Sequence, residues 1–374
     1  MQKPSSDAEI NRYLHLKARK NRIPLAGVFE LTPCCNLACR MCYVRKSAEE
    51  VRSLGGLMNG AEWIELGREA VKNGLLFLLI TGGEPLTHPD FKSIYQSLHK
   101  MGVIISLNTN GTMIDDDMAD FLSKNTPSRV NVTIYGASPE TYETLCGNGS
   151  AYDRAVDGLR RLHARGINVK VNFSITPYNY KDLPRVVALA NELDFQFQCA
   201  SYMFPALRRG EENIGQSERF PPEIAARCQL ESDRLTMTPE KYAQRRENIL
   251  AGIPDTDREC MDMPTEHIRC RAGSSSFWLT WDGTLLPCGM MTQPAYSVKE
   301  LGFRAAWDGV YDAASQIVIP ARCTACSYRH ACMLCPAAAV TETGYFDHYP
   351  PYLCQMTGEL MKLMREEEQH EHQT

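Results

Sequence analysis

The chain has 374 residues, 44% of them hydrophobic, which suits one large domain or two moderate ones around a substantial core. Its formal net charge of −5 argues against a nucleic-acid partner, which would require a strongly basic surface. The first 22 residues contain no long apolar run, so we expect no signal peptide, no membrane span and a cytoplasmic location.

Short apolar runs alternate with helical stretches between residues 26 and 204. The runs lie at 26–31, 75–80, 103–108, 129–134, 169–175 and 195–204. Between them, 61–73 and 151–166 carry apolar residues at helical spacing. This alternation predicts βαβ units with a parallel sheet, hence an α/β fold: a partial (β/α)6 TIM barrel. Its active site is expected at the carboxyl ends of the strands.

The chain changes character after the predicted barrel. Two exposed helices are predicted at 223–235 and 238–250, the second capped by Thr238. From Cys260 onward Cys, Gly and Pro are frequent, so a bound metal is expected to hold this part together. The predicted organisation is an N-terminal segment (1–25), a barrel (26–205), a helical bridge (206–259), a cysteine-rich domain (260–356) and a C-terminal helix with a charged tail (357–374).

The 15 cysteines are unevenly placed. Four lie between residues 34 and 42, and seven lie between 270 and 354, with Cys260 just upstream. An odd number of thiols in a reducing compartment disfavours a disulfide framework, and clustered thiols there usually bind metal. Cys146, Cys199 and Cys228 stand alone and are expected to be small core residues.

Cys35, Cys39 and Cys42 form a CxxxCxxC loop directly after the first predicted strand. Three thiolates can hold three irons of a [4Fe–4S] cube and leave the fourth iron open for chemistry. The alternative is zinc, which needs four ligands. Adjacent Cys34 and Cys35 would then have to share one ion, so we interpret Cys34 as a bystander.

The cysteine loop with its following aromatic Tyr43, together with Thr81-Gly82-Gly83-Glu84-Pro85 after the second strand, resembles the radical S-adenosylmethionine (SAM) superfamily. The resemblance implies reductive cleavage of SAM to a 5′-deoxyadenosyl radical that abstracts hydrogen from a substrate. In this interpretation the two glycines allow close backbone approach to the ligand, and Glu84 complements its ammonium group. The positions implied to bind SAM are Tyr43, Gly82, Gly83, Glu84, Pro85, Asn108, Asn110, Ser138, Asn172, Ser174, Tyr202 and Phe204.

The second group of cysteines resembles the SPASM extension of radical SAM enzymes, although two residues instead of three separate Cys332 from Cys335. That resemblance implies two auxiliary [4Fe–4S] clusters, three clusters in all. The distal set would be Cys323, Cys326, Cys332 and Cys354. The proximal set would be Cys270, Cys288 and Cys335, completed by Cys260 or left with an open iron. A four-cysteine zinc site is the alternative for the two C-x2-C pairs.

The SPASM resemblance implies a peptide or protein substrate, modified by a crosslink, a thioether or epimerisation. An electron donor such as flavodoxin or ferredoxin would supply reducing power. Because 34 residues precede the cysteine loop, we expect no recognition domain in front of it, and a separate protein could present the peptide.

Several alternatives remain open. Sulfatase-type maturases carry an Asp base directly after the cysteine that matches Cys288, where this chain has Gly289. Asp282 is a weak candidate for that base, and Cys199 a weak candidate for a hydrogen-atom donor. A haem-pathway radical SAM enzyme shares the architecture. The non-enzyme alternatives are a zinc-stapled scaffold and an iron–sulfur electron carrier.

Overall fold

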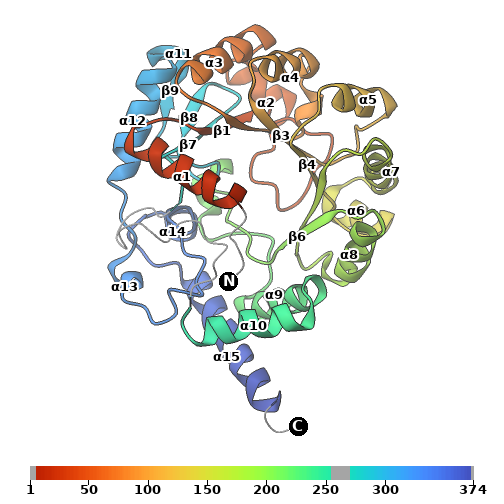
Figure 1. Ribbon diagram of the computed structural model, residues 1–374, viewed down its shortest axis with the longest axis vertical. Coiled ribbons are helices and arrows are strands. Elements are labelled where there is room, and N and C mark those ends of the chain that lie inside the picture. The colour runs from red at the N-terminus through yellow and green to blue at the C-terminus, as the bar shows by residue number, and fades with distance from the viewer. Residues whose placement is uncertain (1–5, 254–269, 372–374) are drawn as a thin grey trace.

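The computed structural model describes residues 6–253 and 270–371, and one nine-stranded sheet organises them (Figure 1). The strand order is β6-β5-β4-β3-β2-β1-β7-β8-β9. Strands β1 to β7 pair in parallel, whereas β8 and β9 are antiparallel additions. The strands are β1 Ala26–Glu30, β2 Phe77–Thr81, β3 Ile104–Thr109, β4 Arg129–Thr133, β5 Val169–Ser174, β6 Gln196–Ala200, β7 Ser276–Leu279, β8 Thr284–Leu286 and β9 Tyr296–Ser297.

The strands form an arc with helices on its outer side (Figure 1). The outer helices are α3 Gly60–Lys72, α4 Phe91–Lys100, α5 Asp116–Lys124, α6 Pro139–Cys146, α7 Ala151–Ala164, α8 Leu183–Glu192 and α12 Phe303–Ser315. The remaining helices are α1 Ser6–Lys20, α2 Ala48–Ser53, α9 Pro222–Thr236, α10 Pro239–Leu250, α11 Val298–Leu301, α13 Ala321–Thr324, α14 Pro336–Thr343 and α15 Pro351–Glu371, besides short 3-10 turns. The predicted partial barrel is confirmed.

The two faces of the sheet differ in polarity. Val130, Val132 and Val171 are buried against the outer helices, where apolar burial stabilises the fold. Side chains alternate between faces along a strand, so Asn131 and Asn172 lie on the inner face. The arc therefore has an apolar outer core and, along β3 to β6, a polar inner wall.

The sheet extends beyond the six predicted strands. Strand β7 pairs with β1, although about 250 residues of sequence separate Val28 from its partner Trp278. Phe277 and Trp307 consequently join the same hydrophobic core as Phe29. The sequence showed Ser276–Leu279 only as a short run, and only the tertiary pairing identifies it as a strand of the barrel sheet.

The two bridge helices lie where the sequence predicted them, and the Thr238 side chain accepts a hydrogen bond from the Lys241 amide. The prediction that they are exposed was wrong for one face. Ala226 and Leu230 of α9 pack with Leu360 and Met364 of α15 in a second hydrophobic cluster. Their burial explains why the bridge is ordered without a place in the sheet.

Across the described ranges 6–253 and 270–371, no helix combines the length and the apolar character that a membrane span requires.

Candidate functional site

The first cysteine loop, residues 33–46, follows β1 at the carboxyl edge of the sheet. The Lys46 amide donates to the Pro33 carbonyl over 3.1 Å and closes the loop. On its other side, the Ala38 amide donates to the Cys146 carbonyl at 2.8 Å, and the Arg40 amide to the Leu145 carbonyl at 3.0 Å. The loop that carries Cys35, Cys39 and Cys42 is thus tied to the end of α6.

Gly82 and Gly83 allow two backbones to lie against each other. The Gly83 amide donates to the Thr32 carbonyl at 2.7 Å, and the Glu84 amide to the Cys34 carbonyl at 2.9 Å. A Cβ at Gly82 would lie 2.4 Å from the Thr32 oxygen, and one at Gly83 would lie 2.4 Å from the Cys34 oxygen. The sequence predicts a close approach of the two glycines to a ligand; in the structure their close neighbour is the first cysteine loop.

Glu84 is fully buried and joins β2 to β3. Its Oε1 accepts from the Thr109 hydroxyl at 2.8 Å and the Leu86 amide at 3.2 Å, and its Oε2 accepts from the Asn110 amide at 2.7 Å. Burial raises its pKa to about 7 against these favourable hydrogen bonds. Glu84 therefore fixes the loop after β3, and three of the roughly four acceptor positions of its carboxylate are occupied.

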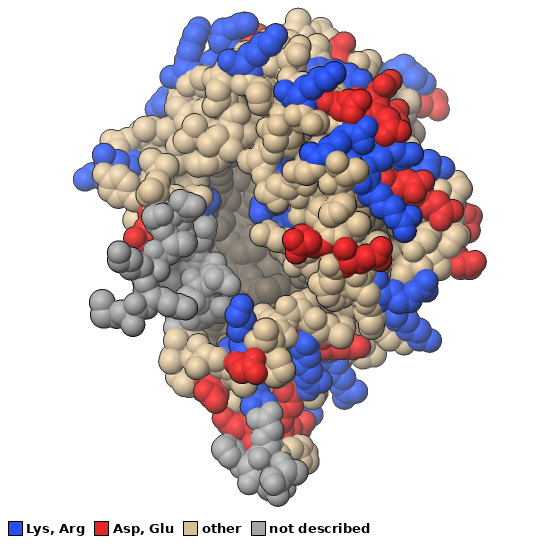
Figure 2. All heavy atoms as spheres, turned by 45° about the vertical axis from the view of Figure 1, so that its right-hand side comes forward, with Lys and Arg blue, Asp and Glu red and all other residues tan. Residues whose placement is uncertain are grey.

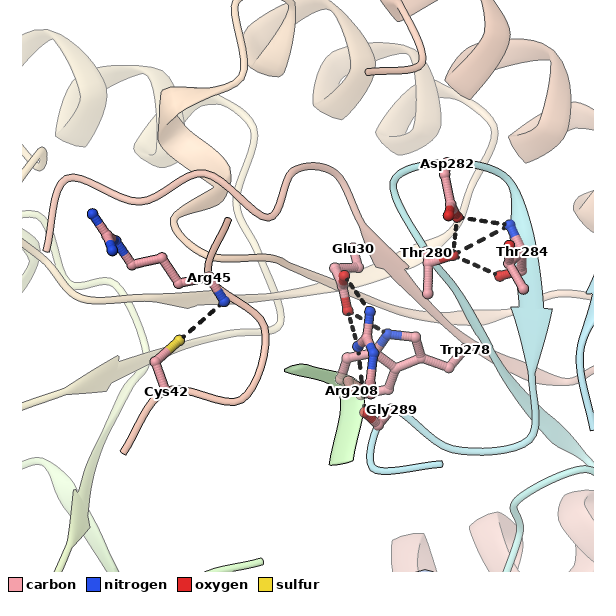
Figure 3. A network of polar contacts seen from close by, with 9 residues as sticks. All are labelled: Glu30, Cys42, Arg45, Arg208, Trp278, Thr280, Asp282, Thr284 and Gly289. Atoms are coloured by element: carbon pink, nitrogen blue, oxygen red, sulfur yellow. Dashed lines mark hydrogen bonds and ion pairs between the residues drawn. The ribbon is translucent and has the colours of Figure 1, made fainter. Parts of the chain in front are cut away.

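The thiols of the first loop receive N–H donors. The Leu37 amide lies 3.4 Å from Cys35 Sγ, and the Arg45 amide lies 3.3 Å from Cys42 Sγ (Figure 3). Such contacts favour a thiolate and tune an iron–sulfur cluster. Burial, with smaller contributions from the charges of Glu84 and the neighbouring thiols, raises the pKa of Cys35 to about 12, a bias that a coordinated cation reverses. Two of the three thiols thus have N–H donors of the kind that suit a metal-bound state.

Five of the other implied SAM positions fall into two groups. Asn108, Asn172 and Ser174 lie on the inner face of β3 and β5, and the Asn172 Oδ1 atom is buried without a hydrogen-bond partner. Ser138 and Asn110 have structural partners. Ser138 caps α6, and Asn110 donates to Asn36 Oδ1 at 2.9 Å beside the first cysteine loop.

Tyr202 and Phe204 lie beyond the end of β6, in the second hydrophobic cluster. The Tyr202 hydroxyl donates to Glu342 at 2.8 Å, and Glu342 is paired with Arg219 at 2.6 Å. The structure therefore places these two residues between the barrel and α14, away from the bonds that surround Glu84.

A buried polar network that the sequence analysis missed connects β1 to the cysteine-rich region (Figure 3). Arg208 binds the Glu30 carboxylate through both terminal nitrogens, at 2.6 and 2.8 Å, and the Trp278 indole donates to the same carboxylate at 2.8 Å. Arg208 also donates to the Gly289 carbonyl, next to Cys288, at 3.3 Å. Its guanidinium carbon lies 5.9 Å from the Tyr43 ring centre, so the network also contacts the first cysteine loop.

The structure brings the four implied distal ligands together. One pocket is lined by Cys323, Cys326, Cys332 and Cys354, together with Tyr328, Arg329 and Tyr349. Burial, and then the other three thiols, raise the pKa of Cys323. We call this the distal pocket.

The implied proximal ligands also share a neighbourhood. Cys270, Cys288 and Cys335 all pack against a small hydrophobic cluster that contains Leu207 and Met291. Cys335 is the N-cap residue of α14, and burial raises its pKa to about 11. The shortened spacing before Cys335 thus still leaves it among the predicted partners. Cys260 lies outside the described residues.

The thiols are not gathered around single points. Considering only the residues that the structure describes, no three His, Cys, Asp or Glu side chains stand close enough to share one metal ion.

The weak catalytic candidate Asp282 has a structural role. It is exposed in the β7–β8 turn, where its Oδ1 accepts from the Thr280 hydroxyl at 2.5 Å and from the Thr284 amide at 3.2 Å (Figure 3). Position 289 offers no substitute, because a Cβ there would lie 2.5 Å from the Trp278 indole. The base of sulfatase-type maturases has no counterpart at either position.

Cys199 does not face the inside of the barrel. Its registered neighbour on β5 is Phe173, which is buried in the outer core, and paired residues share a face of the sheet. Strand β6 is an edge strand with exposed residues, and Cys199 itself is half-buried against the outer core. The register excludes Cys199 as a donor to a substrate on the inner face.

Known proteins resemble this chain in sequence and in fold. A sequence profile of the Radical SAM superfamily matches residues 29–190. The probable GTP 3′,8-cyclase of Aeropyrum pernix is 30% identical over 72% of this chain and 75% of its own length. The AdoMet-dependent heme synthase of Methanosarcina barkeri is 25% identical over 90% of this chain and 97% of its own length.

The fold extends the likeness through the cysteine-rich region. The crystal structure of Streptococcus suis SuiB bound to its precursor peptide SuiA matches 95% of this chain and 82% of that chain, with a TM-score of 0.67 and 18% identity. The cysteine loop, the Gly-Gly-Glu turn that supports it and the extent of the cyclase match lead to one assignment. This chain is an enzyme that belongs to the radical SAM superfamily.

Proposed function

We propose that this enzyme modifies a peptide or protein side chain and holds three [4Fe–4S] clusters, one that binds SAM and two auxiliary ones. The observation that carries the proposal is the grouping of eleven cysteines, ten of them described. Three lie on one supported loop, four line the distal pocket, and three share the proximal hydrophobic cluster.

Cys35, Cys39 and Cys42 would hold the SAM-binding cluster. When bound, that cluster supplies the electron that cleaves SAM into methionine and a 5′-deoxyadenosyl radical. The chain's own residues position the reactants. Glu84 and the two glycines fix the loop, and the polar inner wall of β3 to β5 offers hydrogen-bonding groups to a ligand.

The auxiliary clusters would occupy the distal pocket and the proximal site, with Cys260 as the fourth proximal ligand. Cys326 and Cys354 are exposed, so the distal cluster would lie near the surface, where a flavodoxin or ferredoxin could approach. Arg208 bridges Glu30 and the Gly289 carbonyl and would hold the proximal site against the barrel.

A peptide substrate is supported by the shape of the protein. Figure 2 shows a deep hollow at the centre of one face, wide enough to expose the inner side of the molecule. The SuiB structure, which shares this fold, contains a precursor peptide. We place the substrate of this enzyme in that hollow, with a separate recognition protein as an optional partner.

A haem-pathway reaction is the second candidate. The heme synthase relative aligns over 97% of its own length, which covers both the barrel and the cysteine-rich region. A tetrapyrrole would occupy the same hollow, so the two candidates differ in the ligand and not in the place where it binds.

The test compares Cys42→Ala with its matched control Cys34→Ala after anaerobic reconstitution. We expect about twelve irons in the wild-type chain, about eight in Cys42→Ala, and 5′-deoxyadenosine release with SAM and dithionite only where Cys42 is present. Cys34→Ala should keep both properties. Undiminished cleavage in Cys42→Ala would refute the cluster assignment, and about four irons plus zinc in the wild type would refute the auxiliary clusters.

A further inference from the structure

Two cations on the inner wall of the barrel have no carboxylate partner among the residues that the structure describes. Arg129 begins β4, and Lys170 lies on β5 one position from the strand's start. Lys170 donates to the neutral Gln198 side chain, and the buried Nε atom of Arg129 has no hydrogen-bond partner. Among the described residues neither forms an ion pair, whereas two more deeply buried cations, Arg208 and Arg219, lie against the carboxylates of Glu30 and Glu342.

The strand register brings the two cations to one place. Asn131 pairs with Lys170 across β4 and β5, and Arg129 is two residues before Asn131 on the same face. Burial and the nearby Arg129 lower the pKa of Lys170, so the two charges affect each other. Like charges held together disfavour the folded protein unless a ligand neutralises them.

Side-chain oxygen atoms that accept no hydrogen bond from the described residues lie on the same wall as the two cations. Asn131 is only 6% exposed, and its Nδ2 donates to Asn108 at 2.8 Å, which leaves its Oδ1 buried without a partner. The Oδ1 atom of Asn172, further along the same wall, is likewise buried and unpartnered. Buried polar atoms are normally satisfied, so this wall lacks both an anion and N–H donors.

We propose that this wall binds an acidic segment of the substrate peptide, with a carboxylate between Arg129 and Lys170 and a backbone N–H group on Asn131. The proposal rests on the proposed function and names its substrate class. A peptide offers a carboxylate and outward N–H donors together, whereas the carboxylates of a tetrapyrrole lie on a rim without N–H groups. The observations therefore favour the peptide.

The strand geometry also predicts how far apart the acidic residue and the reacting residue lie in the peptide. Strands rise about 3.3 Å per residue, so Arg129 lies about 13 Å from Thr133 at the carboxyl end of β4. Radical chemistry occurs at that carboxyl end, beside the first cysteine loop. An extended peptide would thus carry its acidic residue about four positions from the residue that loses hydrogen.

The test is binding of a fluorescein-labelled pentapeptide with a central glutamate between alanines, compared with the glutamine version, by anisotropy on the reconstituted holoenzyme with SAM. A charge-assisted contact predicts that the glutamate peptide binds about tenfold tighter or more. The double variant Arg129→Gln/Lys170→Gln should abolish that preference. The control Arg160→Gln/Arg185→Gln removes two cations from the outer helices and should preserve it.

Three outcomes would overturn the proposal. The first is equal binding of the two peptides, including no binding of either, and the second is a preference for glutamate that survives Arg129→Gln/Lys170→Gln. The third is Arg129-dependent binding of iron coproporphyrin III alone, which would assign the wall to a tetrapyrrole. Iron content and 5′-deoxyadenosine release, measured on the same samples, test the proposed function separately. The double variant should retain the iron content, because it removes no cysteine.

Discussion

The first cysteine loop and the distal pocket differ in what holds their cysteine-bearing backbone in place. The first loop is held by backbone hydrogen bonds from the Gly83 and Glu84 amides to residues 32 and 34, and by further bonds to residues 145–146. The distal thiols lie on the four-residue helix α13, which has no buried residue, on the loop after it and at the start of α15. The backbone of the first loop is thus held without a metal, whereas the distal site depends on the metal it would hold.

Removal of the metal would test this difference most directly. We expect hydrogen-exchange protection of residues 321–335 to fall on the order of tenfold or more, because local opening there costs little without the cluster. Strands β2 to β4 should change much less. Mass spectrometry of the holoprotein before and after anaerobic chelation measures both.

The matched variants for that experiment lie in the same segment. Cys326→Ala should reproduce the local loss of protection, and Met333→Ala, which truncates an exposed side chain, should not. Equal loss of protection at the first loop and at residues 321–335 would contradict the comparison.

A smaller effect is expected where packing, not metal, positions a cysteine-bearing loop. Gly289→Ala would place a Cβ 2.5 Å from the Trp278 indole. We expect it to lower the free energy of unfolding by about 1–3 kcal/mol through overpacking. Gly358→Ala is the control, since no atom lies within 4 Å of its Cβ in α15, and it should be neutral or stabilising by up to about 1 kcal/mol.

Chemical denaturation under anaerobic conditions compares the two glycine variants with the wild type. If the Gly289→Ala protein is as stable as the Gly358→Ala protein, the Trp278 side chain can make room for the added Cβ without loss of stability, which would contradict the prediction.

The smallest effect concerns the support of the first loop. Because burial raises the Glu84 pKa to about 7, from an ordinary value near 4.5, the folded state binds this proton more tightly than the unfolded state. The contribution of Glu84 to the free energy of unfolding should therefore fall as the pH rises from about 5 to about 8. Glu84→Gln should lack this slope, whereas the exposed Glu65→Gln should keep it. Denaturation curves across that range provide the measurement, and identical slopes in wild type and Glu84→Gln would contradict the prediction.

The sequence determined the order of the elements and the chemistry of the sites. Local periodicity reveals strands such as Val169–Ser174. The spacing of Cys35, Cys39 and Cys42 places three candidate ligands on one loop, independently of the fold of the rest of the chain. The distal set of cysteines was implied by the resemblance to the SPASM extension, and the fold gathers it in one pocket.

The tertiary structure decided which side each residue faces and which distant residues meet. A short apolar run gives no sign that Trp278 pairs with Val28, and a lone cysteine in a strand could face either side until its partner Phe173 is known. Arg129 and Lys170 look like ordinary surface cations in the sequence. Only the parallel register of β4 and β5 places them together on the inner wall, because pairing depends on contacts that no local pattern encodes.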